Sequence, residues 1–118
     1  MAPTDVPSTV EQYLPLKPVD FMVLLTLAGR ELHGYGIVAE IAERTDGKIA
    51  LVPGNLYSVL QRLRGQGLLD ESDRRPAPDL DDQRRRYYAI TPLGRRVLKA
   101  EAERLRGVVG MAEAMELI

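Results

Sequence analysis

The sequence contains no cysteine, and only one histidine occurs among its 118 residues. The absence of cysteine excludes a disulfide framework, a thiolate zinc site and a cysteine nucleophile. The chain also has no glycine-rich loop of the kind that cradles phosphates, so no catalytic constellation can be assembled from its residues. We therefore expect a protein that is not an enzyme and that uses no metal and no cofactor.

Long hydrophobic runs are also missing. The longest apolar stretch, residues 21–28, is interrupted by Thr26 and is far too short to span a bilayer. Residues 1–17 have neither the basic start nor the apolar centre of a signal peptide. Their prolines and scattered polar residues predict an N-terminal arm, which Val10, Tyr13 and Leu14 could dock. We therefore expect a cytoplasmic protein with no membrane partner.

Positive charge is unevenly distributed along the chain. The net charge of −1 argues by itself against a nucleic-acid-binding protein. However, residues 48–99 carry 11 basic and 6 acidic side chains, whereas residues 1–47 carry 3 and 7 and residues 100–118 carry 2 and 4. A basic central segment is typical of a surface that meets an anionic partner, although an ordinary solvated surface is the simpler alternative.

Hydrophobic residues recur at helical spacing in four segments and at strand spacing in two. Pro18, Pro53 and Pro92 suit the first turns of three helices, and Thr91 is the expected cap of the last one. Helices are predicted from residue 18 to 29, from residues 33–36 to about 44, from residue 53 to the glycines at 65 and 67, and from residue 92 onward. Strands are predicted over residues 68–73 and 84–90, with a proline-rich connection between them.

This order of elements predicts a mainly α (α+β) fold, a winged helix-turn-helix with a C-terminal dimerisation helix. The chain would divide into an arm (1–17), a DNA-binding domain (18–92) and the dimerisation helix (93–118). A helix that enters the major groove needs small and hydrogen-bonding side chains at its leading end. The third helix presents Gly54, Asn55, Ser58 and Gln61 there, and Arg62, Arg64 and the run at 84–86 can neutralise phosphates.

Three stretches in this order resemble the PadR family of transcriptional regulators. The first is LHGYGI at residues 32–37. The second is PGNLY at 53–57, which continues with L at 60, RL at 62–63 and GLL at 67–69. The third is RYYAITPLGR at 86–95. The resemblance covers the chain from about residue 14 to about residue 105. One helix follows the wing, which is typical of the short subgroup of the family.

The resemblance implies a homodimeric repressor that binds a palindromic operator through its third helix and wing. It also implies pairing through the C-terminal helices and, in some members, release of DNA on binding small phenolic or hydrophobic compounds. The DNA contacts predicted from the residues and the resemblance together are His33, Tyr35, Gly54, Asn55, Tyr57, Ser58, Gln61, Arg62, Arg84 and Arg85. The predicted dimer stripe consists of Leu98, Ala102, Leu105, Val109, Ala112 and Met115.

The sequence departs from the family pattern at two places. Asn55 stands where the family usually carries threonine or serine, which predicts a different base preference. The wing tip carries three aspartates, which phosphates would repel, so contact from the wing base through Arg74, Arg84 and Arg85 is favoured. The sequence has no tryptophan, which excludes a tryptophan-lined drug pocket at the dimer interface.

Several residues have a plainer interpretation beside the functional one. His33 could cap the second helix, Tyr35 and Tyr57 could only pack, and Arg86 could pair with an acid. Arg95 and Arg96, at the start of the last helix, oppose its dipole and suggest an external anion or a nearby carboxylate. The alternative for the whole chain is a winged-helix module that binds a protein and no specific DNA.

Overall fold

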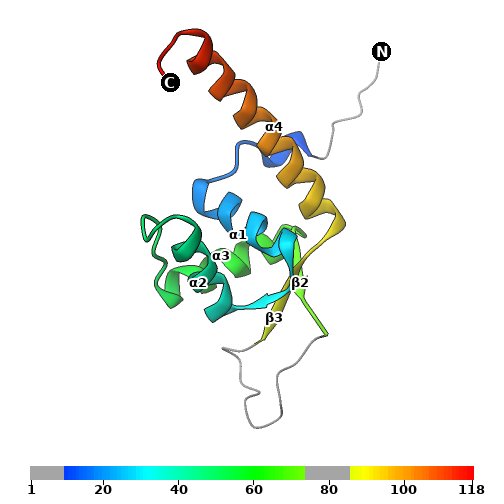
Figure 1. Ribbon diagram of the computed structural model, residues 1–118. Coiled ribbons are helices and arrows are strands. Elements are labelled where there is room, and N and C mark those ends of the chain that lie inside the picture. The colour runs from blue at the N-terminus through cyan, green and yellow to red at the C-terminus, as the bar shows by residue number, and fades with distance from the viewer. Residues whose placement is uncertain (1–9, 74–85) are drawn as a thin grey trace, which may run out of the picture.

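A computed structural model describes residues 10–73 and 86–118 (Figure 1). The predicted helix starts at Pro18, Pro53 and Pro92 are confirmed, because each proline occupies the first helical position, where no amide hydrogen is needed. The elements in chain order are a 3₁₀ turn η1 (Glu11–Tyr13), α1 (Pro18–Gly29), β1 (Leu32–His33), α2 (Gly34–Arg44), α3 (Pro53–Gly65), β2 (Leu69–Glu71), β3 (Tyr87–Ile90) and α4 (Pro92–Ala114).

The strands form a small antiparallel sheet in the order β1-β3-β2. Strand β3 is central, and Leu32 and Glu71 both pair with Tyr88 from opposite sides. β1 was not predicted, since two residues are too few to show a strand period. β2 is shorter than the predicted segment 68–73, and residues 84 and 85 of the second predicted strand lie outside the described residues.

The hydrophobic core lies between the sheet and helices α1, α2 and α3 (Figure 1). The stripe predicted on the third helix is confirmed, because Leu56, Leu60 and Leu63 are all buried. The first helix buries Val23, Leu24 and Leu27 in this core, whereas Leu25 is 43% exposed. Within residues 10–73 and 86–118, no helix is long and apolar enough to cross a membrane.

The base of α4 is held tightly against the core. The Thr91 hydroxyl accepts a hydrogen bond from the Gly94 N–H at 3.0 Å, as its predicted capping role requires. A side-chain Cβ at Gly94 would lie 2.0 Å from the carbonyl oxygen of Leu68, so only glycine allows this approach. Val97 is fully buried, and Leu98 is 7% exposed. Leu98, which was predicted in the dimer stripe, is therefore a core residue of its own chain.

The segment before α1 packs on α4 beyond its base (Figure 1). The Leu16 N–H donates to Oε2 of Glu101 at 3.0 Å, and the Tyr13 hydroxyl donates to the carbonyl oxygen of Gln66 at 3.3 Å. Glu101 is 1% exposed and also pairs with Arg104. Hydrogen bonds from Arg104 lower the pKa of Glu101, and burial opposes this shift. This end of the predicted arm is thus docked, with Tyr13 among its partly buried residues.

Candidate nucleic-acid interface

The outer face of α3 is exposed and contains no carboxylate. Its residues recur at intervals of three and four, opposite the buried leucine stripe, and all of them are exposed to solvent. Three of the predicted DNA contacts lie there, namely Gly54, Ser58 and Gln61. The structure therefore places small and hydrogen-bonding groups along one accessible line of a helix, and a helix needs such a line to approach base edges in a major groove.

The two flanks of α3 face different neighbours. On one flank, Asn55, Ser58 and Arg62 line a shallow groove of about 410 Å³ whose other wall includes Lys17 at the start of α1. On the other flank, Tyr57 and Gln61 line the space toward the sheet. Tyr57 is 53% exposed, so its hydroxyl remains available to a partner. The predicted contacts of α3 thus cover its outer face and both edges.

Arg62 is held by an internal acid. Its guanidinium pairs with the carboxylate of Asp20 on α1, which is 5% exposed. Burial of an unpaired carboxylate is costly, so this ion pair has a structural role in joining α1 to α3. Arg62 keeps part of its side chain at the surface. A phosphate contact from Arg62 would therefore be shared with Asp20.

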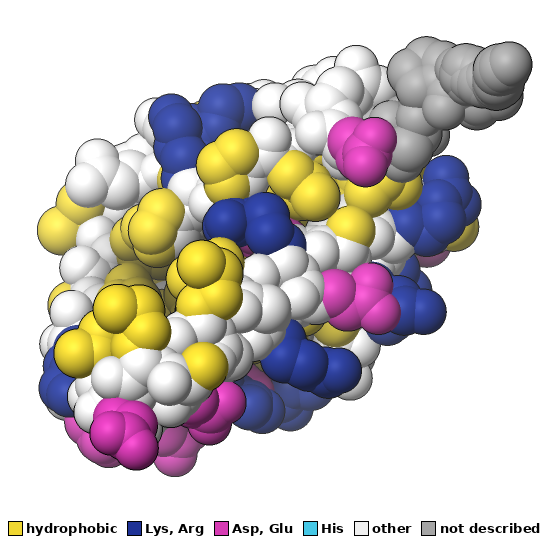
Figure 2. All heavy atoms as spheres, turned by 90° about the horizontal axis from the view of Figure 1, so that it is seen from above, with side chains coloured by type: hydrophobic (Ala, Val, Ile, Leu, Met, Phe, Trp, Pro, Cys, Tyr) yellow, Lys and Arg dark blue, Asp and Glu magenta, His cyan; other side chains and the backbone are white. Residues whose placement is uncertain are grey.

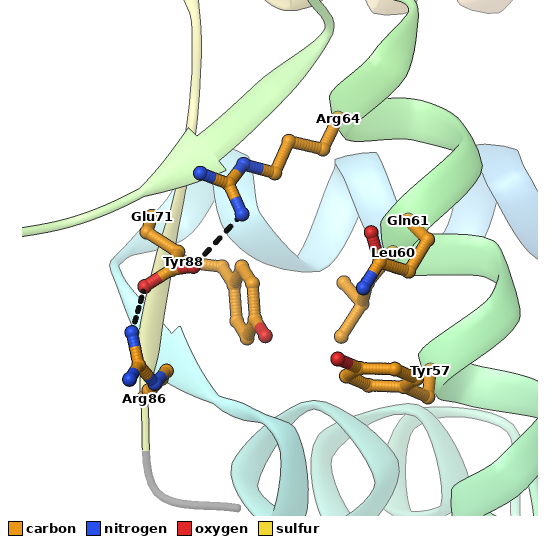
Figure 3. A pocket seen from close by; sticks show the side chains of 7 residues that line it. All are labelled: Tyr57, Leu60, Gln61, Arg64, Glu71, Arg86 and Tyr88. Atoms are coloured by element: carbon orange, nitrogen blue, oxygen red, sulfur yellow. Dashed lines mark hydrogen bonds and ion pairs between the residues drawn. The ribbon is translucent and has the colours of Figure 1, made fainter. Parts of the chain in front are cut away.

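A crevice of about 160 Å³ separates α3 from the base of the wing (Figure 3). Arg64 on α3 donates from Nη1 to Oε2 of Glu71 at 2.8 Å, and Arg86 donates from Nη1 to Oε1 of Glu71 at 2.9 Å. Arg64 also reaches Asp70 at 3.1 Å. The pairing of Arg86 with an acid, which the sequence offered as its plainer interpretation, is confirmed.

Tyrosines complete the lining of this crevice. Figure 3 shows the hydroxyls of Tyr57 and Tyr88 directed toward the same space, with Gln61 beside them. The pKa of Tyr88 is raised above its ordinary value, chiefly by burial and secondarily by the carboxylate of Glu71. Tyr88 therefore keeps its proton at neutral pH and can serve as a hydrogen-bond donor.

His33 has the capping role that the sequence left open. Its Nδ1 accepts a hydrogen bond from the Gly36 N–H at 3.0 Å, at the start of α2. Its ring also makes edge contacts with Tyr87, at a centroid distance of 5.3 Å, and with Tyr35, at 6.3 Å. Because of these contacts, His33 has a structural role and helps to orient the side chain of Tyr35.

Tyr35 and Tyr57 are brought together from different helices. They line an apolar cavity of about 100 Å³ at the start of α2 and α3, together with Val38, Leu56 and Tyr88. This cavity adjoins the crevice, since Tyr57 and Tyr88 border both. The aromatic side chains of the predicted site therefore form one continuous surface next to the outer face of α3.

The remaining basic residues of the prediction are placed differently. Arg84 and Arg85, like Arg74 and the acidic wing tip, lie outside the described residues. Arg95 donates from Nη2 to the carbonyl oxygen of Ala28 at 3.2 Å, so within the described residues it contacts the end of α1. Within residues 10–73 and 86–118, Arg96 makes no hydrogen bond or ion pair and remains available for an external anion.

The far half of α4 presents an unpaired apolar surface. Figure 2, which looks onto this end of the molecule, shows hydrophobic side chains gathered there among a few charged ones. Val109 and Met115 of the predicted stripe are 46% and 69% exposed, Ala102 is exposed, and Leu105 and Ala112 are partly buried. Further exposed apolar residues of this half are Val108, Met111, Leu117 and Ile118.

Sequence reasoning missed the acids that hold the arginines. Asp20 is a single carboxylate at the start of a nearly continuous apolar run, and such a position signals a buried ion pair. Glu71 pairs with Tyr88 in the register of the sheet, so it could be placed only once the strand alignment was known. Both acids neutralise arginines that the charge count had assigned to DNA.

Comparisons with known proteins agree on one family. The family described as "Transcriptional regulator PadR-like family" matches residues 23–100. A curated transcriptional regulator of Mycobacterium tuberculosis is 34% identical over 92 residues, which cover 75% of this chain and 79% of that protein. The chain spans only 23% of another curated relative, an uncharacterised transposon protein of Streptomyces fradiae that is 35% identical over 89 residues.

Solved structures share the fold. A PadR family transcription regulator of Clostridium difficile has a TM-score of 0.71 at 21% identity, covering 84% of this chain and 98% of that chain. The PadR of Bacillus subtilis, solved in complex with operator DNA, has a TM-score of 0.61 at 21% identity, covering 73% of this chain and 47% of that chain. The described fold is accordingly a PadR-type winged helix. With the family match over most of its length, the chain belongs to the PadR-like family of transcriptional regulators.

Proposed function

We propose that the chain is a transcriptional repressor that binds a palindromic operator as a homodimer, with α3 in the major groove. The observation that carries the proposal is the outer face of α3, which is exposed, free of carboxylates and lined by Gly54, Ser58 and Gln61. Such a face can approach base edges closely and form hydrogen bonds with them. The Bacillus subtilis relative, solved with operator DNA, supports the same use of a similar fold.

The apolar far half of α4 supports the dimer. Exposed side chains such as Val109, Met111 and Met115 form a patch that would be covered in a pair of copies. In this proposal residues 18–92 bind DNA and residues 93–118 pair the subunits. A two-fold dimer would place its two α3 helices in successive major grooves, about 34 Å apart. Repression would follow from blocking access of polymerase.

The apolar cavity supports the proposal of a small hydrophobic or phenolic effector. Tyr35, Val38 and Leu56 give it an apolar wall, and Tyr57 connects it to the DNA-facing surface. An effector seated there would shift the position of Tyr57 and so change the affinity for DNA. Thermal shift measurements with a panel of phenols test this part, and a Val38→Trp variant that fills the cavity should abolish any response.

Binding to the DNA directly upstream of the gene tests the proposed function. Fluorescence anisotropy at several salt concentrations, with unrelated duplex as competitor, should show tight binding that survives the competitor and weakens steeply with salt. Sedimentation should show a dimer on and off DNA. Equal and weak binding to both duplexes would instead favour a protein-interaction module or a distant operator.

A further inference from the structure

We propose that the crevice between α3 and the wing base binds one backbone phosphate of the duplex, and that Glu71 is its internal counter-ion. The wing base here means Glu71 on β2, Arg86 directly before β3, and Tyr88 on β3. The proposal rests on the function proposed above and goes beyond the predicted phosphate contacts of Arg64 and Arg86, because it brings them together in one site and gives Glu71 and Tyr88 a role in it. In the free protein, the carboxylate of Glu71 occupies this site.

The geometry of the ion pairs defines the site. The two oxygens of Glu71 are bound by two different guanidinium groups, Oε2 by Arg64 at 2.8 Å and Oε1 by Arg86 at 2.9 Å. A phosphodiester presents two charged oxygens to the same pair of donors, and arginine forks suit both anions. The Tyr57 hydroxyl, the Gln61 amide and the protonated Tyr88 hydroxyl supply further donors around the same space (Figure 3).

The exposure of these groups favours an exchange with DNA. The side chains of Arg64 and Arg86 are 46% and 38% exposed, whereas that of Glu71 is 20% exposed. The arginines can therefore meet an approaching phosphate while Glu71 stays behind them. Gln61 belongs both to the outer face of α3 and to the crevice, so the strand that borders the occupied groove passes this place.

Glu71 consequently weakens binding that does not depend on sequence. Free arginines bind any duplex by releasing counterions, with a salt slope of about 0.9 for each phosphate neutralised. Arginines that already hold a carboxylate contribute less, because the phosphate must compete with Glu71. Only a complex docked closely enough to bring the phosphate into the crevice gains the full contact.

The test compares Glu71→Gln with Glu31→Gln in the full-length protein. Both variants remove one negative charge near the wing, but Glu31 accepts only from Ser72 at 2.6 Å among the contacts described and holds no arginine. For unrelated duplex, Glu71→Gln should steepen the salt slope by about one to two and raise the affinity about tenfold near 0.1 M salt. Glu31→Gln should change both much less. Asp70→Asn, which removes the second partner of Arg64, should act weakly in the same direction.

A double-variant background makes the test specific. Replacing Arg64 and Arg86 by glutamine should remove most of the effect of Glu71→Gln, since the two guanidinium groups that the structure shows on Glu71 are then absent. Equal gains in Glu71→Gln and Glu31→Gln, or weaker binding by a Glu71→Gln protein with an unchanged melting temperature, would overturn the proposal.

Two further measurements distinguish the remaining interpretations. A wild type that binds no duplex at all would refute the proposed function, and the phosphate site with it. Calorimetry with inorganic phosphate at constant ionic strength should show no saturable binding to either protein. Saturable binding of free phosphate by the wild type would assign the crevice to a small anion and overturn the duplex assignment.

Discussion

Arg62 belongs both to the folded core, through its ion pair, and to the proposed DNA-binding surface. It lies on the edge of α3, and its guanidinium neutralises the buried carboxylate of Asp20. Arg64 and Arg86 are likewise held by Glu71. At the scale of single residues, these three arginines of the basic central segment are therefore already paired with carboxylates of the same chain.

Truncating Arg62 should destabilise the protein as well as weaken DNA binding. Arg62→Ala leaves Asp20 buried without a partner, so we expect a loss of about 1–3 kcal/mol in the free energy of unfolding, measured with denaturant. Arg106→Ala, an exposed arginine of α4, is the matched control and should change stability little. Equal stability of the two variants would contradict the structural role of the ion pair.

Gln61 should determine base preference without affecting stability. Its side chain is exposed on the outer face of α3, where an amide can make paired hydrogen bonds with adenine. Gln61→Ala should cost about 1–3 kcal/mol of discrimination at one operator position and leave binding to unrelated duplex nearly unchanged. Binding titrations on a panel of single-base operator variants would show this. Gln66→Ala, just beyond the helix, should keep the wild-type preference.

At the scale of elements, the start of α4 packs very closely against the chain before β2, and among the described glycines Gly94 has the closest contact. A methyl group at Gly94 would collide with the backbone of Leu68, whereas at Gly107 the same methyl would meet nothing within 4 Å. Gly94→Ala should therefore destabilise the protein by about 1–3 kcal/mol or more. Gly107→Ala should stabilise it by up to about 1 kcal/mol, because alanine is the better helix former. Thermal unfolding of both variants in parallel would reveal opposite signs.

The contact between α4 and the segment before α1 should depend on acid. Because the folded pKa of Glu101 is lowered, its carboxylate contributes stability that is present above its unfolded pKa and is lost as pH falls through the folded value. The protection of the Leu16 amide against hydrogen exchange, corrected for the intrinsic exchange rate at each pH, should accordingly fall as the pH drops through the lowered pKa of Glu101. In Glu101→Gln that acid-dependent step should be absent. The exposed Glu103→Gln variant should retain it.

Elements with local signals were predictable from the sequence, and elements made by distant pairing were not. The helices begin at Pro18, Pro53 and Pro92 because proline and the Thr91 cap act within one turn. β1 exists only through its pairing with β3, 50 or more residues away, which no local pattern encodes. The outer face of α3 was predictable for the same reason as the helices, since helical spacing alone separates it from the leucine stripe.

The partners of the site residues were beyond sequence reasoning. The pairing of Arg62 with Asp20 spans 42 positions and depends on how α1 crosses α3. Leu98 fitted the spacing of the dimer stripe. However, α4 approaches Leu68 closely at Gly94, and the side chain of Leu98 is therefore buried in the core. Periodicity reports which residues share a face of a helix. It does not report which neighbour covers that face.

At the scale of the whole molecule, the uncovered half of α4 should decide the oligomeric state. Val109→Glu combined with Met115→Glu places two charges in the exposed apolar patch. We expect a monomer by sedimentation, an unchanged circular dichroism spectrum, and operator affinity reduced at least about a hundredfold because the two half-sites no longer bind together. Glu103→Lys, which alters charge on an exposed position of α4 outside the stripe, should remain dimeric. A dimeric double variant would place the interface elsewhere.

The rigid seat of α4 has a consequence for operator geometry. The helix has 23 residues and is therefore about 34 Å long, so a tilt of about 10° at Gly94 displaces its far end by about 6 Å. In a dimer joined at those far ends, the direction of α4 sets the distance between the two α3 helices. Inserting one base pair between half-sites moves them apart by about 3.4 Å. Variants at Gly94 should consequently change which insertions are tolerated, while leaving the preferred bases of each half-site as they are.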